Sequence, residues 1–299
     1  MSKQRNIATG HLAAFGAYLI FGLNVVFCKD MANSGSIEPG LLFGIRSLIA
    51  AGLFWAASAF IKREALSWRD LLAMAGAALL GLVIPQMTFL YAITMTAPIT
   101  LSVVNSITPI VTMFLAAIFL REPITWKKAL GVAVSFGGVV WLIMQRNDGT
   151  GNSSTLGVLL CVVNSVSFAC YLGTCRPLIK RYNSVNLMKW MFTVAFLATL
   201  PQSLWGLGCT DLAAVPPSVW WEVAYLVFFA TFVAYFLIPV AQQRIRPTLV
   251  SMYGYMQPVI AAVVGVWMGM DSLTWTKAAA ALLVFAGVYI VNRSRAAAG

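Results

Sequence analysis

Hydrophobic residues in this chain run in long blocks separated by short polar segments. The blocks are roughly 17 to 23 residues long, the length at which one helix crosses the hydrocarbon core of a bilayer. The pattern therefore predicts an all-α membrane protein. Its ten predicted transmembrane helices cover residues 10–29, 39–61, 70–92, 98–120, 126–144, 156–176, 187–207, 219–241, 248–269 and 275–292.

A single offset relates the two halves of the chain. The residues that a shift of 149 positions superimposes include Pro98 and Pro247, Ser102 and Ser251, Pro109 and Pro258, Phe136 and Phe285, and Gly138-Val139 and Gly287-Val288. This unbroken register indicates a duplicated unit. Each copy holds five predicted helices, an odd number, so the second copy must cross the membrane in the opposite direction. We expect two inverted five-helix repeats, residues 1–148 and 149–299, divided by the polar linker from Gln145 to Thr155.

Composition and charge agree with this topology. Hydrophobic residues make up 60% of the chain and charged residues 10%, whereas soluble proteins are about 45–50% apolar and about 25% charged. The net charge of +11 comes mainly from Lys and Arg in alternate short loops, not from a basic face of the kind that binds nucleic acid. Because basic loops remain in the cytoplasm, both termini are predicted to be cytoplasmic and the chain to lie in the cell (inner) membrane.

The residues available for chemistry argue against an enzyme. All nine carboxylates fall in loops or at helix ends, and the one histidine, His11, lies at the membrane edge. The five cysteines form no CxxC pair, which supports neither a zinc site nor a disulfide framework. We expect no cofactor, metal or catalytic residue, and proton coupling through a buried carboxylate loses support.

Polar residues inside the predicted helices are the candidates for a binding site, because a polar group in hydrocarbon needs a partner, water or a cavity. The candidates for a substrate cavity are Asn24, Gln86, Asn105, Thr108, Pro109, Asn164, Tyr171, Tyr235, Ser251, Tyr255, Gln257 and Pro258.

Two of these candidates, Pro109 and Pro258, occupy equivalent positions in the two copies. Each proline leaves the carbonyl four residues earlier, of Asn105 and Gly254, without its helical partner. Freed carbonyls at equal depth in two inverted helices can line a binding cavity. The alternative is a pair of kinks that serve packing alone.

An aromatic stripe in the eighth predicted helix has two readings. Tyr225, Phe228, Phe232 and Tyr235 follow a 3-4-3 spacing, which puts them on one face of a regular helix. They form either an aromatic wall of the cavity or a face that packs against lipid and other helices.

Two basic residues lie within or beside predicted helices. Arg46, in the second helix, and Lys29, at the end of the first, could attract a substrate carboxylate. A structural pairing with Asp30 or Glu38 is the alternative.

Inverted repeats around a polar midplane are typical of a secondary transporter, whose two conformations open to opposite sides of the membrane. We expect a small-molecule carrier embedded in the lipid bilayer, compatible with a monomer, that exports amino acids or related metabolites. A drug or other metabolite permease, a non-transporting receptor and an intramembrane enzyme are the alternatives.

Three motifs fit one known family. Phe21-Gly22-Leu23-Asn24 through Lys29 is similar to the first-helix pattern W-G-x-N-x(4)-K, with Phe21 in place of Trp. Arg121-Glu122-Pro123-Ile124-Thr125 is similar to an E-P-[LI]-T turn after helix four, and Arg46 stands at a common second-helix arginine. Together they resemble the EamA-type ten-helix exporters of the drug/metabolite transporter superfamily. The resemblance implies a central cavity lined mainly by helices 1, 3, 4, 6, 8 and 9, with helices 5 and 10 as scaffold.

Overall fold

The computed structural model describes residues 2–62, 64–96, 101, 104–144, 154–267 and 275–293, and within them every regular element is a helix. The helices of the first half are α1 (Ser2–Ser34), α2 (Pro39–Ser58), α3 (Trp68–Ala78), η1 (Leu79–Val83), α4 (Ile84–Met95), α6 (Thr108–Leu120) and α7 (Trp126–Met144). Those of the second half are α8 (Thr155–Thr174), α9 (Arg176–Arg181), α10 (Ser184–Cys209), α11 (Pro217–Tyr225), η2 (Leu226–Val233), α12 (Ala234–Arg244), α13 (Pro247–Met252), η3 (Tyr253–Tyr255), α14 (Met256–Trp267) and α15 (Trp275–Arg293).

Several helical segments have the length and composition of membrane spans. Within the described residues, the six that are long and apolar enough are Asn6–Ser34, Pro39–Ser58, Trp68–Met95, Thr155–Thr174, Ser184–Cys209 and Pro217–Arg244. Thr108–Leu120 and Ala278–Arg293 are shorter apolar helices. The chain therefore has several segments suited to crossing a bilayer.

Most helix boundaries lie within a few residues of the expected spans, although α1 extends beyond the expected 10–29 at both ends. The expected helix at 126–144 coincides with α7, whereas the one at 248–269 is divided into α13, the 3-10 turn η3 and α14. In the span expected at 98–120, a turn at Ser106 and Ile107 precedes α6. Pro98, Ser102 and the linker positions 145–153 lie outside the described residues.

Polar side chains begin these helices in the ordinary way. The first free backbone N–H groups of a helix need acceptors. Ser67 Oγ accepts from Asp70 N at 3.1 Å, Ser154 Oγ from Gly157 N at 2.9 Å, and Asn183 Oδ1 from Val185 N at 2.9 Å.

Two spans contain a π-helical segment, in which the wider i→i+5 turn changes the direction of the side chains that follow. These segments, η1 and η2, overlap when the sequence is shifted by 149 positions. In η2, Thr231 Oγ1 donates to the carbonyl of Leu226, five residues earlier, at 2.7 Å. This bond joins the two ends of the wide turn.

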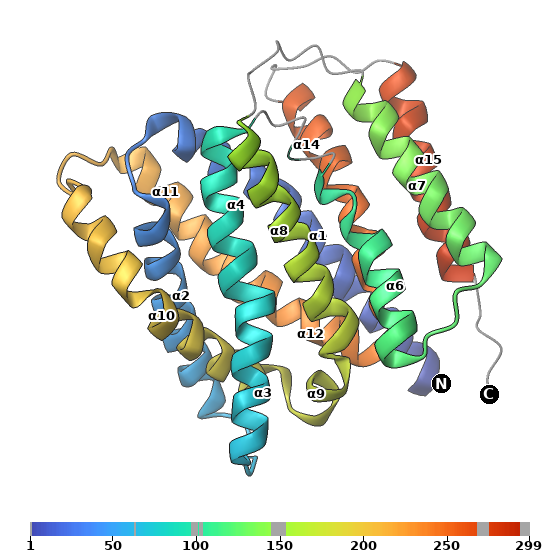
Figure 1. Ribbon diagram of the computed structural model, residues 1–299, viewed down its shortest axis with the longest axis horizontal. Helices are drawn as coiled ribbons and strands as arrows, with labels where there is room; N and C mark the ends of the chain where they lie inside the picture. The colour runs from blue at the N-terminus through green and yellow to red at the C-terminus, as the bar shows by residue number, and fades with distance from the viewer. Residues whose placement is uncertain are drawn as a thin grey trace.

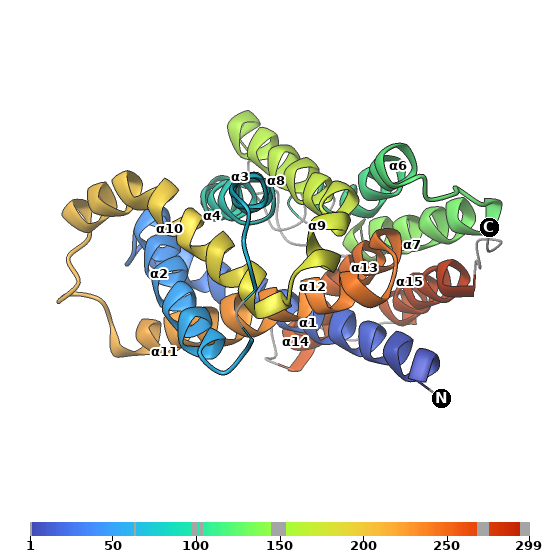
Figure 2. The same cartoon turned by 90° about the horizontal axis from the view of Figure 1, so that it is seen from below.

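The helices of the two halves pair according to the same offset. α7 and α15 differ by 149 at both ends and pack side by side at one edge of the bundle, while α2 and α10 pack at the other (Figure 1). Between these pairs, α4, α8 and α6 lie along one side and their counterparts α12, α1 and α14 along the other (Figure 2).

The contact between α7 and α15 depends on small residues. Gly131 lies against Gly287 and Val291, whereas Gly138 lies against Ala280 and Val284. The order of these contacts means that the two helices run antiparallel. Small residues at such a contact let the two backbones approach closely.

Some residues separated by the offset contact each other directly. Gln86 Nε2 donates to Tyr235 Oη at 2.5 Å, and Ser135 Oγ donates to the carbonyl of Val284 at 3.1 Å. Both pairs are 149 residues apart. Positions related by the offset therefore meet where the two halves are in contact.

Basic residues gather at the end of the bundle that holds the start of α1, the start of α3, α9 and the end of α15 (Figure 1). Lys128 forms a buried ion pair there with Glu122, Nζ to Oε1 2.6 Å. Burial lowers the pKa of Arg176 in α9, an effect that the Glu122 carboxylate opposes. The charge of Arg176 in turn lowers the pKa of Lys180, and burial adds to that shift.

Candidate functional site

A cavity with two adjoining chambers lies in the middle of the bundle, between the two halves. Each chamber has a volume of about 80 Å³. Val25, Asn105, Asn164, Phe168 and Gln257 line both. Because these five residues face both spaces, the chambers are two parts of one site.

Most of the residues predicted from the sequence meet at this cavity. Those that line one or both chambers are Asn24, Gln86, Asn105, Thr108, Pro109, Asn164, Tyr235, Ser251, Gln257 and Pro258. They come from α1, α4, residues 105–109 at the start of α6, α8, α12 and the α13–α14 segment. These are the six spans that the family resemblance implies. Among the described lining residues none belongs to α7 or α15.

Interrupted helices bring two of these segments to the cavity. α6 begins at Thr108 with Pro109 in its first turn, directly after the turn at Ser106 and Ile107. In the other half, η3 separates α13 from α14, and Pro258 follows two residues after α14 begins. Pro109 and Pro258 therefore lie near the start of a helix, not in the middle of a continuous one, and both line the first chamber.

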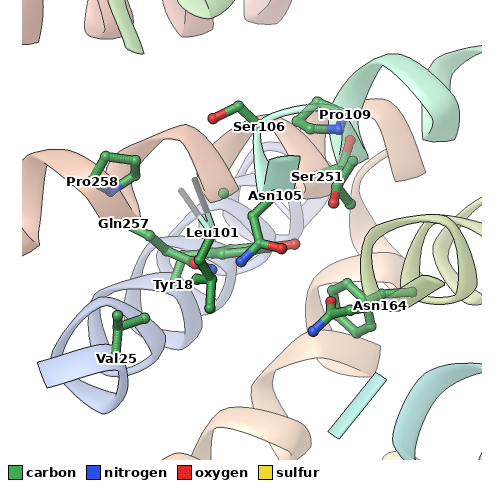
Figure 3. A pocket seen from close by; sticks show the side chains of 13 residues that line it. Tyr18, Val25, Leu101, Asn105, Ser106, Pro109, Asn164, Ser251, Gln257 and Pro258 are labelled. Atoms are coloured by element: carbon green, nitrogen blue, oxygen red, sulfur yellow. The ribbon is translucent and has the colours of Figure 1, made fainter. Parts of the chain in front are cut away.

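Hydrogen bonds hold three of the amide side chains in the cavity wall. Ser165 Oγ donates to Asn105 Oδ1 at 3.1 Å, and Asn164 Nδ2 donates to the carbonyl of Pro85 at 3.1 Å. Gln86 donates to Tyr235, as described above. Figure 3 shows the side chains of Asn105 and Gln257 directed toward each other across the first chamber.

Several apolar and aromatic residues of the wall were not among the predicted ones. Tyr18 and Val25 line the first chamber, and Phe21 and Val25 the second. Their i, i+3, i+7 spacing puts them on one face of α1, a signal present in the sequence. Phe168 lies one turn after Asn164 on α8 and faces both chambers.

Tyr171 and Tyr255, also predicted, lie outside the two chambers. Tyr171 is two helical turns from Asn164, and its ring packs against Gly81 in η1, where an added Cβ would lie 2.7 Å from the ring. Tyr255 ends the 3-10 turn and is buried in a cluster with Met113, Met252 and other apolar residues. The 3-10 turn has three residues per turn, so it moves Tyr255 off the face that a regular α-helix would give it.

The aromatic stripe at 3-4-3 spacing does not form a single wall. Tyr235 lines the second chamber, whereas Phe232 packs on Phe54 of α2 and Phe228 is 47% exposed. Tyr225 packs against Phe27. The π-helical segment η2 lies within this stripe and rotates its members apart.

Neither Arg46 nor Lys29 is among the residues that line the two chambers. Arg46 is fully buried, its Nε donates to Thr231 Oγ1 at 2.9 Å, and its two terminal nitrogens have no partner among the described residues. Lys29 Nζ donates to the carbonyl of Ile93 at 3.1 Å. Glu38, one of the proposed acidic partners, instead caps α2 and accepts a short hydrogen bond from Tyr91. Among the described residues, Glu38 therefore forms no ion pair with Arg46 or with Lys29.

A larger recess of about 470 Å³ lies at the end of the bundle opposite the basic residues. Its wall includes Glu38, Cys209 and Asp211. None of the predicted cavity residues lines it, so it is separate from the central site.

The chain matches the EamA-like transporter family over residues 8–144 and 155–293. It belongs to this family. Together with the apolar helices, the match identifies a multi-pass membrane transporter. The resemblance drawn from the sequence motifs is confirmed at the level of the family.

Relatives of this EamA-family chain carry names of transporters. A protein of Archaeoglobus fulgidus called "uncharacterized transporter" is 27% identical over 262 residues, covering 87% of this chain and 90% of that one. A "probable amino-acid metabolite efflux pump" of Salmonella typhimurium is 27% identical over 282 residues, 91% of each. A "probable terminal-alkyne amino-acid exporter" of Streptantibioticus cattleyicolor is 28% identical over 198 residues, covering 65% of this chain and 64% of that one. These names agree with the expectation of a transporter and not an enzyme.

A crystal structure of similar fold supports the helical architecture of this EamA-family protein. It superimposes with a TM-score of 0.77 over 96% of both chains, at 18% sequence identity. At that identity the similarity concerns the fold alone.

Proposed function

We propose that this EamA-family transporter exports amino acids or related small metabolites across the cytoplasmic membrane by alternating access. Its two halves, residues 1–148 and 149–299, act as inverted five-helix repeats, and the central cavity binds the substrate. The observation that carries the proposal is the position of the cavity, where equivalent residues of the two halves meet. Gln86 and Tyr235, 149 residues apart, are bonded to each other in its wall.

Three features support an inverted duplication. α7 and α15 have boundaries related by 149 residues and pack antiparallel. Their Ser135 and Val284, also related by the offset, share a hydrogen bond. A two-fold relation in the membrane plane makes two conformations of similar energy available, each open to one side.

The chemistry of the cavity supports a small amphipathic substrate. Amides and hydroxyls lie next to the aromatic rings of Phe21, Phe89 and Phe168. Such walls bind the apolar body of a ligand while a few polar groups orient it. Two relatives are named for amino-acid export or for efflux of an amino-acid metabolite, which agrees with this class.

Transport by purified protein tests the proposal. In proteoliposomes loaded with radiolabelled amino acids, we expect release faster than from protein-free vesicles, with counterflow when unlabelled substrate is outside. Absence of flux for every amino acid, with flux of a drug or another metabolite, would replace amino acids as the substrate class. Absence of any flux would contradict the transport proposal itself.

The proposed orientation places both termini in the cytoplasm, because basic residues gather at the end where α1 begins and α15 ends. A cysteine added at either terminus of a cysteine-free variant should react with an impermeant maleimide only after the cells are permeabilised. Labelling of just one terminus in intact cells would contradict the odd number of spans in each half.

Pro109→Ala and Pro258→Ala should each slow transport several-fold while leaving the amount of folded protein almost unchanged. Alanine supplies an N–H and favours a continuous helix through the interruption, which would straighten the wall of the first chamber. The measurement is the initial rate of counterflow per amount of folded protein. Pro201→Ala is the control, since Pro201 lies inside α10 away from both chambers. Equal rates in all three variants would mean that the interruptions serve packing alone.

A further inference from the structure

Two positively charged side chains each bind the end of a helix, at places that the offset relates. Lys29 Nζ donates to the carbonyl of Ile93 at 3.1 Å, and Arg176 Nε donates to the carbonyl of Gln242 at 3.1 Å. Ile93 and Gln242 are 149 residues apart, and each lies in the last turn of its helix, α4 or α12. Carbonyls of a last turn lack a partner within the helix and carry partial negative charge. Each cation therefore ties the end of one helix to a neighbouring segment.

The two bonds lie on opposite sides of the central cavity. Ile93 follows Gln86 by seven residues on α4, and Gln242 follows Tyr235 by seven residues on α12. Seven residues are about two helical turns, or about 10 Å, so each carbonyl lies on the same face as a residue that lines the second chamber. Ile93 lines the recess at one end of the bundle, whereas Gln242 is bound by α9 at the other, basic end (Figure 1). The contact between Gln86 and Tyr235 is thus flanked by one charged bond on each side.

Only a thin layer of side chains separates the second chamber from this recess. On α1, Asn24 lines the chamber and Cys28, one turn later, lines the recess, with Cys28 Sγ donating to Asn24 Oδ1 at 3.6 Å. On α4, Phe89 lines the chamber and the next residue, Leu90, lines the recess. A solute that leaves the chamber for the recess has to part α1 and α4 at this place. These are the two helices that the first of the charged bonds joins.

The bond from Arg176 has the matching place at the basic end. α9, which carries Arg176, follows directly on α8, and α8 and α12 both contribute to the wall of the second chamber. Arg176 lies two positions from the residue that the offset pairs with Lys29. Its bond to Gln242 therefore joins the counterparts of α1 and α4 on the other side of the cavity.

We infer from this arrangement that the two bonds are the gates of the transporter. The outer gate, Lys29 with Ile93, closes the way from the second chamber to the recess, which serves as the exit vestibule. The inner gate, Arg176 with Gln242, closes the way to the cytoplasm. Alternating access requires that the two break in turn, and both are formed in this structure. The inference rests on the proposed alternating access and orientation, and adds the residues that hold each side shut.

Reaction of a cysteine in the cavity tests the gates. Phe168→Cys in a cysteine-free protein places a thiol at a position that faces both chambers. An impermeant methanethiosulfonate reagent is added to intact cells for access from outside, and to inside-out vesicles for access from the cytoplasm. We expect Lys29→Met to raise the rate from outside and lower it from inside, and Arg176→Met to do the reverse. The ratio of the two rates should change about tenfold in each variant, the effect of losing a hydrogen bond to a charged group.

Lys127→Met is the control, since it removes an exposed positive charge at the start of α7, away from both chambers. Lys29→Arg and Arg176→Lys keep the charge and a donor, and should keep a ratio of rates close to the native one. Thermal unfolding shows whether each variant is folded, and glutamine takes the place of methionine in a variant that is not.

An equal change in both rates, or an unchanged ratio in Lys29→Met and Arg176→Met, would overturn the assignment of the gates. Reaction from both sides in the parent protein would then still support alternating access. Reaction from one side only in every variant would instead contradict alternating access itself, and the gates with it. If the two effects appear with the sides exchanged, the gates stand and the proposed orientation is wrong.

Discussion

Gly138→Leu is expected to separate α7 from α15 and to lower the stability of the protein by about 1–3 kcal/mol, the usual cost of overpacking. A Cβ at this position would lie 2.9 Å from the carbonyl oxygen of Ala280 and 3.0 Å from Leu283 Cβ. The backbone of α15 cannot yield as a flexible side chain would, so the whole helix must move. That movement would also strain the hydrogen bond from Ser135 to Val284.

Gly137→Leu is the matched control, since it places the same side chain one residue earlier on the same helix. A Cβ at Gly137 meets nothing within 4 Å, and leucine favours a helix more than glycine does. The melting temperature in detergent should fall for Gly138→Leu and stay the same or rise for Gly137→Leu. Similar melting temperatures for the two variants would mean that the close contact between α7 and α15 does not contribute to stability.

Arg46→Met and Arg46→Lys are expected to affect stability in different ways. Arg46 is fully buried, and the described residues provide only the Thr231 hydroxyl as a partner for its guanidinium. Methionine removes the charge and keeps much of the volume, so stability should change little or increase. Lysine keeps the charge but replaces the planar guanidinium and its fixed Nε donor to Thr231 by a compact, more strongly hydrated ammonium group. It should destabilise the protein by about 1.5–3 kcal/mol, the range for a hydrogen bond to a charged group.

The measurement for Arg46 is thermal unfolding combined with counterflow. If Arg46→Lys proves as stable as the native protein and Arg46→Met does not, the guanidinium site must contain water or an anion that satisfies any cation. The transport rate of Arg46→Met, if folded, then reports whether the charge itself is needed. A matched substitution at an exposed position of the same helix, Ala56→Met, controls for the added methionine.

Most helices could be predicted from the sequence because they depend on apolar patterns that extend over many residues, whereas the inverted repeat stays a prediction. The offset of 149 positions relates the boundaries of α7 to those of α15, and the apolar block at 126–144 coincides with α7. The interruptions could not be predicted so easily. A π-helical turn such as η1 needs one extra residue in the turn, and its apolar residues carry no distinctive signal.

Polar residues of the candidate site could be predicted because they stand out in apolar helices. Positions next to a break in a helix were harder to predict, because the break changes the direction of the side chains. Asn105, Asn164 and Gln257 meet at the cavity because each has few other ways to be solvated. Tyr255 was expected to line the cavity, but it ends the 3-10 turn and lies in an apolar cluster instead. Tyr18 was missed because a tyrosine in an apolar helix resembles a packing residue.

Whether these residues bind substrate stays a prediction. Several such residues line the cavity in each half of the chain. A single substitution should therefore remove one contact with the substrate and leave the others in place. A shared loss of rate alone would indicate a general effect on the helices.

The hydrogen bond between Gln86 and Tyr235 has an implication for how the chain arose and diverged. When two identical copies of a unit pair about a two-fold axis, a residue on that axis contacts the same residue of the other copy. Any mutation of that residue therefore changes both sides of the contact at once. Under the proposed duplication, fusion would leave the two positions free to differ, and here an amide faces a phenol. A protein assembled from two first halves would place Gln86 opposite Gln86, without the aromatic ring of Tyr235. Under the proposed duplication each half is therefore the specific complement of the other, and we expect that neither can be replaced by a second copy of its neighbour.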